Sequence, residues 1–141
     1  SLLYPAMLRK NAKVELIAAV PLFAQCSKRA LAEIASLADE LFLPAGRRLT
    51  AEGGSGHEFV VIAAGAAEVK RGGRILNRLG AGDFLGEIAL VTGRPRTATV
   101  TTTEPSRLLV LGAREFRRLL RDLPGLQLKV LDALGERLPQ E

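Results

Sequence analysis

An α+β domain in which helices flank an antiparallel jelly roll is the fold class that this sequence predicts, and three observations lead to it. The spacing of apolar residues changes from a period of about 3.6 to a period of 2 near residue 40, and it returns to the helical value after residue 112. The segments between those points are short and closed by glycine or proline, which is typical of small antiparallel barrels and jelly rolls. A chain of 141 residues with 48% hydrophobic content also suits one domain with its own core.

We therefore expect a single domain over residues 1–141. It is divided into N-terminal helices over residues 3–39, an eight-stranded antiparallel β-barrel or jelly roll (a double-stranded β-helix) over residues 40–112, and two C-terminal helices over residues 113–138. Aromatic residues make up only 4% of the chain and tryptophan is absent, so we expect a core of Leu, Val, Ile and Ala.

The N-terminal part predicts two helices. Residues 3–24 show patchy helical spacing with an interruption, and Pro21 ends that element. Ser27 is a favourable N-cap for the next helix. Apolar residues at helical intervals after it predict an amphipathic helix over residues 28–39.

Seven of the eight or so expected strands can be assigned to ranges in the central part, and a helical segment interrupts them. Their expected ranges are 40–43, 48–51, 58–63, 66–71, 74–79, 97–102 and 106–111. Gly72 and Gly73 form a two-residue hairpin turn between two of these strands. The segment over residues 82–98 is the helical interruption of the barrel wall, and its residues carry the chemistry described below.

Helical spacing returns in the C-terminal part. Phe116, Leu119, Leu120 and Leu123 lie at i, i+3, i+4 and i+7, and Pro124 breaks or restarts the helix there. A final helix is marked by Leu126, Val130, Leu131, Leu134 and Leu138.

The formal net charge of +5 raises the question of a nucleic acid or membrane partner. The basic residues are scattered along the chain without a run of five or six like charges, so we expect a solvated surface and no direct binding of nucleic acid. No apolar run approaches the roughly 20 residues needed to cross a bilayer. Cys26 is the single cysteine, which excludes an intrachain disulfide and favours a small core residue in a reducing, cytoplasmic setting.

Residues 84–100 contain the one cluster of residues that suggests a ligand. Gly86 and Glu87 begin a short apolar segment that resembles the first turn of a helix, where exposed N–H groups bind anions. Glu87 offers a carboxylate that can accept hydroxyl hydrogen bonds, and Arg96 offers a planar cation suited to phosphate. Each residue alone has a plainer explanation, Glu87 as an acid favoured at a helix start and Arg96 as a surface arginine. Their combination favours a sugar phosphate or a nucleotide.

Catalytic and metal-binding sets are not suggested by the sequence. His57 is the only histidine, so a jelly-roll metal site with two or three histidines is excluded. A phosphate-binding loop of the type G-x-x-x-x-G-K-(S/T) is also missing. We expect neither an enzyme, nor a metal, nor a cofactor.

The same segment resembles the phosphate-binding cassette of the cyclic nucleotide-binding domains, the family of the catabolite activator protein, the protein kinase A regulatory subunits and the cyclic-nucleotide-gated channels. Their pattern is roughly F-G-E-(I/L)-A-L followed by (P)-R-(S/T/A)-A-x-V. The matching residues are Phe84, Gly86, Glu87, Ile88, Ala89, Leu90, Pro95, Arg96, Thr97, Ala98 and Val100, with Leu85 inserted after the phenylalanine. Further similarities are Pro21-Leu22-Phe23, Pro44-Ala45-Gly46 and Glu52-Gly53 with Gly56, and the resemblance covers roughly residues 15–138. His57 departs from it, because the family often has an acid there.

The resemblance implies a role for each cassette residue. Glu87 would bind the ribose 2′-hydroxyl, while Arg96 would pair with the cyclic phosphate together with the backbone N–H groups of Ile88 and Ala89 and the hydroxyl of Thr97. In the family a threonine at the place of Thr97 can also bind guanine, yet nothing else in this sequence recognises guanine. We therefore expect cyclic AMP (cAMP) as the ligand, with cyclic GMP (cGMP) as the alternative.

Three residues outside the cassette are implicated less directly. Val69 and Leu76 lie on the strands that flank the base in the family, and they are equally well explained as ordinary barrel core. Arg137, on the last helix, matches an arginine that stacks over the purine in some members, or it is a solvated arginine that complements the helix dipole.

The expected function is that of a regulatory sensor, in which the nucleotide rearranges the C-terminal helices and so signals to an effector domain in the parent chain or in a partner protein. Two alternatives stay open. One is an interaction module that keeps the fold without binding a ligand. The other is the sensor half of a DNA-binding transcription regulator, which would need a helix-turn-helix beyond the last helix.

Overall fold

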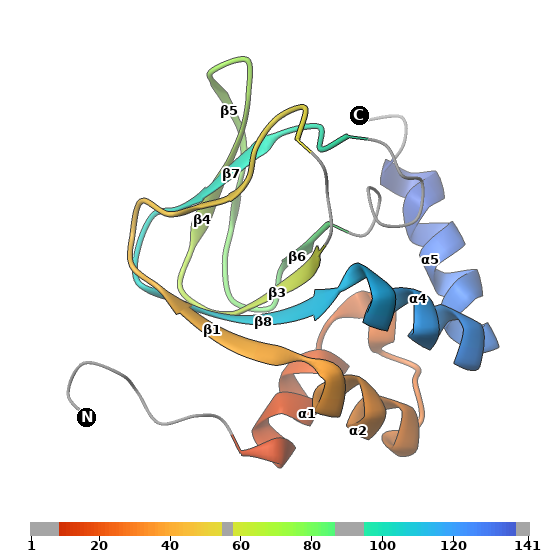
Figure 1. The fold of residues 1–141 in the computed structure, drawn as a ribbon. Coiled ribbons are helices and arrows are strands. Elements are labelled where there is room, and N and C mark those ends of the chain that lie inside the picture. Colours follow the sequence, from red (N-terminus) through yellow and green to blue (C-terminus); the bar gives the residue numbers. More distant parts are fainter. Residues whose placement is uncertain (1–8, 55–57, 87–94, 138–141) are drawn as a thin grey trace.

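The computed structural model describes residues 9–54, 58–86 and 95–137, and it consists of two β-sheets with helices at one end (Figure 1). The N-terminal helices are α1 (Lys10–Ala18), the 3₁₀ turn η1 (Pro21–Phe23) and α2 (Lys28–Leu37). Ser27 caps α2 as expected, because its hydroxyl accepts a hydrogen bond of 3.1 Å from the backbone N–H of Ala30. Helix α2 ends two residues before the predicted limit, since the backbone at Ala38 is already extended and leads into a strand.

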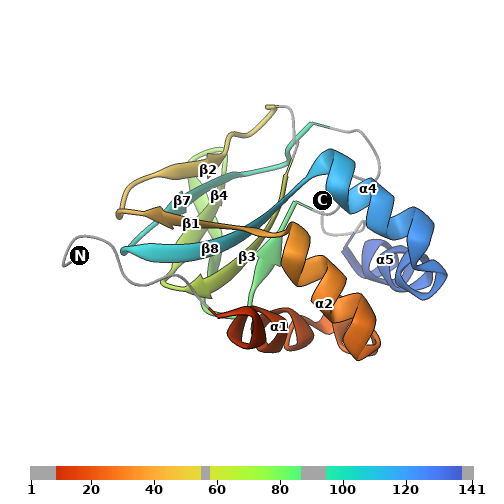
Figure 2. The same cartoon turned by 60° about the horizontal axis from the view of Figure 1, so that its bottom comes forward.

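Eight strands form two four-stranded antiparallel sheets, which confirms the jelly roll. The first sheet has the order β1 (Asp39–Leu43), β8 (Ser106–Gly112), β3 (Glu58–Ala64) and β6 (Phe84–Leu85). The second has the order β2 (Arg48–Thr50), β7 (Thr99–Thr102), β4 (Ala67–Arg71) and β5 (Arg74–Leu79). Figure 2 shows the two sheets facing each other, with the helices on the side of the first sheet that is turned away from the second.

A closed barrel is the part of the predicted fold that the structure corrects. In the described ranges no hydrogen-bonded ladder joins the two sheets, so β1 and β6 end one sheet and β2 and β5 end the other. Strand β6 was also not expected as a strand. It is only two residues long, and its sequence was assigned to the helical cassette; pairing of Val60 with Leu85 and of Val61 with Phe84 makes it part of the sheet.

The turn between β4 and β5 confirms the two-glycine hairpin. Arg71 pairs directly with Arg74, which leaves Gly72 and Gly73 as the two turn residues. Their φ angles are 57° and 78°, and a hairpin turn with two positive φ angles requires residues without a Cβ.

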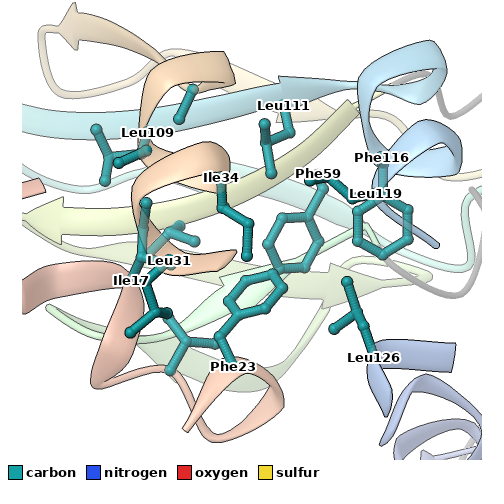
Figure 3. Packing of buried hydrophobic residues seen from close by; sticks show 14 residues of the cluster. Ile17, Phe23, Leu31, Ile34, Phe59, Leu109, Leu111, Phe116, Leu119 and Leu126 are labelled. Carbon is teal, nitrogen blue, oxygen red and sulfur yellow. The ribbon is translucent and has the colours of Figure 1, made fainter. Parts of the chain in front are cut away.

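The larger core is mainly aliphatic, as expected, but aromatic rings form its centre (Figure 3). Phe59 is fully buried, and its ring centroid lies 5.7 Å from that of Phe23, 5.8 Å from that of Phe84 and 5.2 Å from that of Phe116. Aliphatic residues of α1, α2 and β8 surround these rings. Few aromatic residues are present, but they are concentrated at one point.

A second, aliphatic core fills the space between the two sheets. It consists of Val60, Ile62, Ala67, Leu85, Val100 and Leu108. Strand β3 contributes to both cores, because successive side chains point to opposite faces of a strand. Phe59 and Val61 therefore face the helices, while Val60 and Ile62 face the second sheet.

Two further helices complete the chain, α4 (Ala113–Asp122) and α5 (Pro124–Arg137). Phe116 and Leu119 of α4 and Leu126 of α5 are buried in the aromatic core, as the helical spacing predicted. Leu131 was among the residues that marked the final helix, yet it is 60% exposed, and its neighbour Leu128 is 67% exposed. Helix α5 therefore packs along one side and leaves large apolar side chains on the other.

We expect Phe59→Ala to lower the free energy of unfolding by about 3–5 kcal/mol, because it removes the ring that the other three rings contact. Urea denaturation followed by circular dichroism measures the effect. Phe42→Ala is the matched control, since Phe42 is only partly buried and stacks on Arg107 at 4.9 Å. Equal losses for the two variants would show that Phe59 has no special place in the core.

Candidate functional site

Arg96 is anchored through its backbone to the loop that follows β2. Its N–H donates to the carbonyl oxygen of Gly54 at 2.7 Å, and its carbonyl oxygen accepts from the N–H of Gly53, also at 2.7 Å. Two such bonds act as a short antiparallel bridge between segments far apart in the sequence. The backbone of Arg96 is thus fixed three residues before β7 begins at Thr99.

The guanidinium of Arg96 is oriented by the backbone of β3. Its Nη2 donates a hydrogen bond of 2.8 Å to the carbonyl oxygen of Glu58, and the residue is half-buried. Hydrogen bonds from a charged donor are stronger than neutral ones, so this contact holds the side chain against the start of the strand.

Gly86 lies directly against this guanidinium. A Cβ built on Gly86 would collide with the carbonyl oxygen of Glu58 and would lie 2.7 Å from Nη1 of Arg96. The φ angle of Gly86 is +101°, a conformation that other residues rarely adopt. Glycine is therefore required here both by its backbone conformation and by the lack of space for a side chain. The structure places Gly86 beside Arg96, and the binding of a ligand by these two residues stays a prediction.

Thr97 is held by a residue that the sequence did not single out. The Nε of Arg71, at the end of β4, donates a hydrogen bond of 2.9 Å to the carbonyl oxygen of Thr97. Because Thr97 follows Arg96 directly, this bond fixes the chain on the other side of the guanidinium. It also explains why β7 begins two residues later than predicted, since the Thr97 carbonyl binds a side chain instead of a neighbouring strand.

Glu52 connects the surrounding loops. Its carboxylate accepts a hydrogen bond of 2.9 Å from the N–H of Gly72 in the hairpin turn, and its own N–H donates to the Oγ1 of Thr99 at 2.9 Å. The loop after β2, the turn between β4 and β5, and the start of β7 are thereby joined around Arg96. This arrangement presents one guanidinium on a fixed frame, as a site for a single phosphate requires.

A family model matches the part of the chain that forms this arrangement. The model described as "Cyclic nucleotide-binding domain" matches residues 40–122, which include Gly86, Arg96 and both sheets. The chain belongs to the cyclic nucleotide-binding domain family.

Two curated relatives match this cyclic nucleotide-binding domain over about three quarters of its length. The chain is 36% identical over 107 residues to a cAMP-dependent protein kinase regulatory subunit of Eremothecium gossypii, a match that covers 75% of this chain and 23% of the relative. It is 37% identical over 110 residues to a cyclic nucleotide-gated potassium channel of Rhizobium etli, covering 78% of this chain and 31% of the channel. The chain thus spans between a fifth and a third of the length of these relatives.

Solved structures agree with the fold of the cyclic nucleotide-binding domain. The catabolite activator protein of Thermus thermophilus superimposes with a TM-score of 0.78 at 27% identity, and the match covers 85% of this chain and 59% of that chain. The resemblance found in the sequence is therefore confirmed at the level of family and fold.

Several predicted site residues of the domain lie outside the described residues or have no described side chain. Glu87, Ile88 and Ala89 belong to residues 87–94, which the structure does not describe, and so does the expected first turn of the cassette helix. Arg137 is the last residue of α5, and its side chain is outside the description. The roles of these residues stay predictions.

Val69 and Leu76, the two residues expected beside the base, differ in their surroundings. Val69 pairs with Val100 and packs, partly buried, against the core between the sheets. Leu76 is 53% exposed and lies where the register of β4 and β5 shifts, as in a β-bulge. Barrel core is thus the wrong explanation for Leu76, whereas Val69 does line the interior.

Metal-binding groups and a reactive thiol were also considered from the sequence. Among the described residues, no set of three or more His, Cys, Asp or Glu could hold a metal ion, and His57 lies outside them. Burial raises the pKa of the half-buried Cys26, although the charge of Lys129 opposes this shift. The thiol therefore stays protonated at neutral pH, which agrees with a packing role.

We expect Gly86→Ala to destabilise the domain by about 1–3 kcal/mol, because the new Cβ meets a backbone carbonyl and the φ angle is unfavourable. Chemical denaturation gives the comparison with Gly80→Ala, whose added Cβ would have no atom within 4 Å. The control is expected to change stability by less than about 0.5 kcal/mol. A neutral Gly86→Ala would contradict the close approach of Gly86 to Arg96.

Proposed function

We propose that this domain is a regulatory sensor that binds one cyclic nucleotide, cAMP in the first place and cGMP as the alternative, and that its C-terminal helices carry the signal to an effector. The observation that supports it most directly is the guanidinium of Arg96, held between Gly86 and the carbonyl of Glu58 in a member of the cyclic nucleotide-binding family. A cyclic phosphodiester carries one negative charge, so one arginine together with backbone N–H groups is sufficient without a metal.

Each part of the nucleotide has a proposed partner. Arg96 binds the cyclic phosphate, with the N–H groups of Ile88 and Ala89 and the hydroxyl of Thr97 beside it. Glu87 accepts the hydrogen bond of the ribose 2′-hydroxyl. Val69 and Leu76 flank the base from β4 and β5, and Arg137 stacks over it from the end of α5. The half-exposed Leu76 supports this role, because a side chain outside the core has apolar surface to offer to a purine.

The choice of cAMP rests on what surrounds the base. Thr97 alone would permit recognition of guanine. The residues that β4 and β5 offer to the base are Val69 and Leu76, which are apolar and cannot form the further hydrogen bonds that would select guanine. The relative from Eremothecium gossypii is named as cAMP-dependent, which adds support for this ligand.

The aromatic core gives the proposed route from the site to the helices. Phe84 lies two residues before Gly86 and packs on Phe59, which in turn packs on Phe116 of α4. Leu126 of α5 joins the same cluster. A nucleotide that draws the cassette toward Arg96 would therefore alter the packing under both helices. The nucleotide shifts the equilibrium toward the arrangement that contacts it better, by no more than its difference in affinity for the two states.

Helix α5 has the features expected of an element that can change position. Leu128 and Leu131 are exposed on it, and Ile75 and Leu76 are exposed on β5. Closure of α5 over the base would bury apolar surface on both sides, at roughly 25 cal/mol per Å². The signal then passes from α5 to an effector in the parent chain or in a partner protein.

Arg96→Ala is expected to weaken cAMP binding roughly 30- to 4,000-fold, since removal of one partner leaves a buried phosphate without its counter-charge. Isothermal titration calorimetry with cAMP and with cGMP measures this loss and shows which base is preferred. Arg47→Ala is the matched control, because Arg47 is exposed in the turn before β2. Binding that survives Arg96→Ala undiminished would remove Arg96 from the site. A wild-type domain that binds neither nucleotide would favour the ligand-free interaction module instead.

Glu87→Ala tests the ribose contact. We expect it to weaken cAMP binding roughly 10- to 100-fold, the value of a hydrogen bond to a charged acceptor, and to weaken 2′-deoxy-cAMP binding less than about threefold. The same calorimetric titration serves for both ligands. Equal losses for the two nucleotides would show that Glu87 does not contact the 2′-hydroxyl.

A further inference from the structure

The outer face of α4 is a stripe of arginines. Arg114, Arg117, Arg118 and Arg121 are all exposed, and they lie at i, i+3, i+4 and i+7. Because successive residues of a helix turn by about 100°, these four side chains share one face that extends for about 10 Å along the axis. Phe116 and Leu119 are buried on the opposite face. We call these four residues the arginine stripe.

The arginine stripe has a strong excess of one charge. The acids of the same helix are Glu115 in its first turn and Asp122, whose carboxylate lies 3.7 Å from Arg118 with both side chains about half exposed. Such a surface pair contributes little, so the positive charge of the stripe is only partly compensated. Helix α2 shows the usual alternative, because its exposed Lys28 and Arg29 are followed by Glu33 and Ser36. The stripe is therefore not the ordinary mixed surface of a helix in this chain.

The next helix, α5, has an exposed apolar face. Leu128 and Leu131 of α5 are 67% and 60% exposed, and helical geometry places them opposite the buried Leu126. Helices α4 and α5 pack side by side, and the amide of Gln127 donates a hydrogen bond to the carbonyl of Leu120. Both helices bury their inner faces in the same core, so both outer faces lie on the outside of one helical pair.

We propose that the outer surface of the α4–α5 pair docks on the anionic surface of a lipid bilayer. Each arginine near an anionic membrane surface raises the partition coefficient of a protein roughly fivefold. Clusters of at least four basic residues on an amphipathic helix are typical of such binding. The exposed leucines suit the boundary between headgroups and acyl chains. None of the helices in the described ranges is long and apolar enough to cross a bilayer.

Other anionic partners match this surface less well. A nucleic acid would leave the exposed Leu128 and Leu131 without an apolar partner, whereas a bilayer supplies one. An acidic protein segment would have to complement the convex face of a helix, whereas fluid headgroups can rearrange around it. The inference does not depend on nucleotide binding.

Sedimentation with vesicles tests the docking. Wild-type protein is mixed with phosphatidylcholine vesicles that contain about one third phosphatidylserine, at physiological salt. The test variant replaces the arginine stripe by Arg114→Gln, Arg117→Gln, Arg118→Gln and Arg121→Gln. The matched control is Arg47→Gln, Arg48→Gln, Arg74→Gln and Arg78→Gln, which removes the same charge from exposed residues of the second sheet and its loop. We expect the partition coefficient of the stripe variant to fall about 100-fold or more, and that of the control to fall less than about fivefold.

The leucines supply a second measurement. Leu128→Gln with Leu131→Gln is expected to lower vesicle binding about tenfold without a change of net charge. Circular dichroism and an unchanged midpoint of urea denaturation establish that each variant is folded.

Several results would overturn the docking on lipid. They are failure of the wild type to bind anionic vesicles, equal binding to vesicles of phosphatidylcholine alone, and equal losses for the stripe variant and its control. Binding that depends on the stripe but occurs only with a DNA duplex, or only with polyglutamate, would assign this surface to nucleic acid or to an acidic protein.

Discussion

The peptide unit that joins Glu58 to Phe59 connects the two halves of this molecule. On one side its carbonyl oxygen accepts the hydrogen bond of Arg96 and leaves no room for a side chain on Gly86. On the other side the ring of Phe59 packs on three other phenylalanines, from η1, β6 and α4. Because a peptide group is planar and stiff, a displacement of the carbonyl cannot leave the adjoining residue unaffected. The candidate site and the helical core therefore share one rigid piece of backbone.

Strand β3 is well suited to be the fixed part of this arrangement. It lies between β8 and β6 in its sheet and contributes side chains to both cores, so its position is determined from several sides. The elements that contact Phe59 are less constrained. Strand β6 is two residues long and lies at a sheet edge, while α5 enters the core through Leu126 and leaves Leu128 and Leu131 exposed. A rearrangement would therefore move β6 and the C-terminal helices around a stationary strand.

Local signals explain what the sequence predicted well. The N-cap at Ser27, the hairpin at Gly72 and the proximity of Gly86 to Arg96 each follow from a residue type that one conformation requires. Four features depended on tertiary structure and were missed. Glu58 contacts Arg96 through its backbone carbonyl oxygen, which every residue type has, so the sequence does not reveal this contact. Arg71 contacts Thr97 only because the register of the strands brings the two residues together. The open sheets depend on pairing between distant edges, and the low aromatic content concealed how closely four rings cluster.

The arginine stripe shows why charge has to be judged in three dimensions. A search for consecutive like charges finds nothing in α4, because Glu115 and Phe116 separate the first arginine from the central pair, and Leu119 and Leu120 separate that pair from the last one. Helical geometry brings them together on one side. Phe116, on the inner side of the same helix, packs on Phe59 and hence next to the site. If a nucleotide shifts α4, linkage requires that lipid binding and nucleotide binding change each other's affinity by the same factor. A helix with one face in the core and the other on the bilayer would then make the membrane itself an effector of the domain.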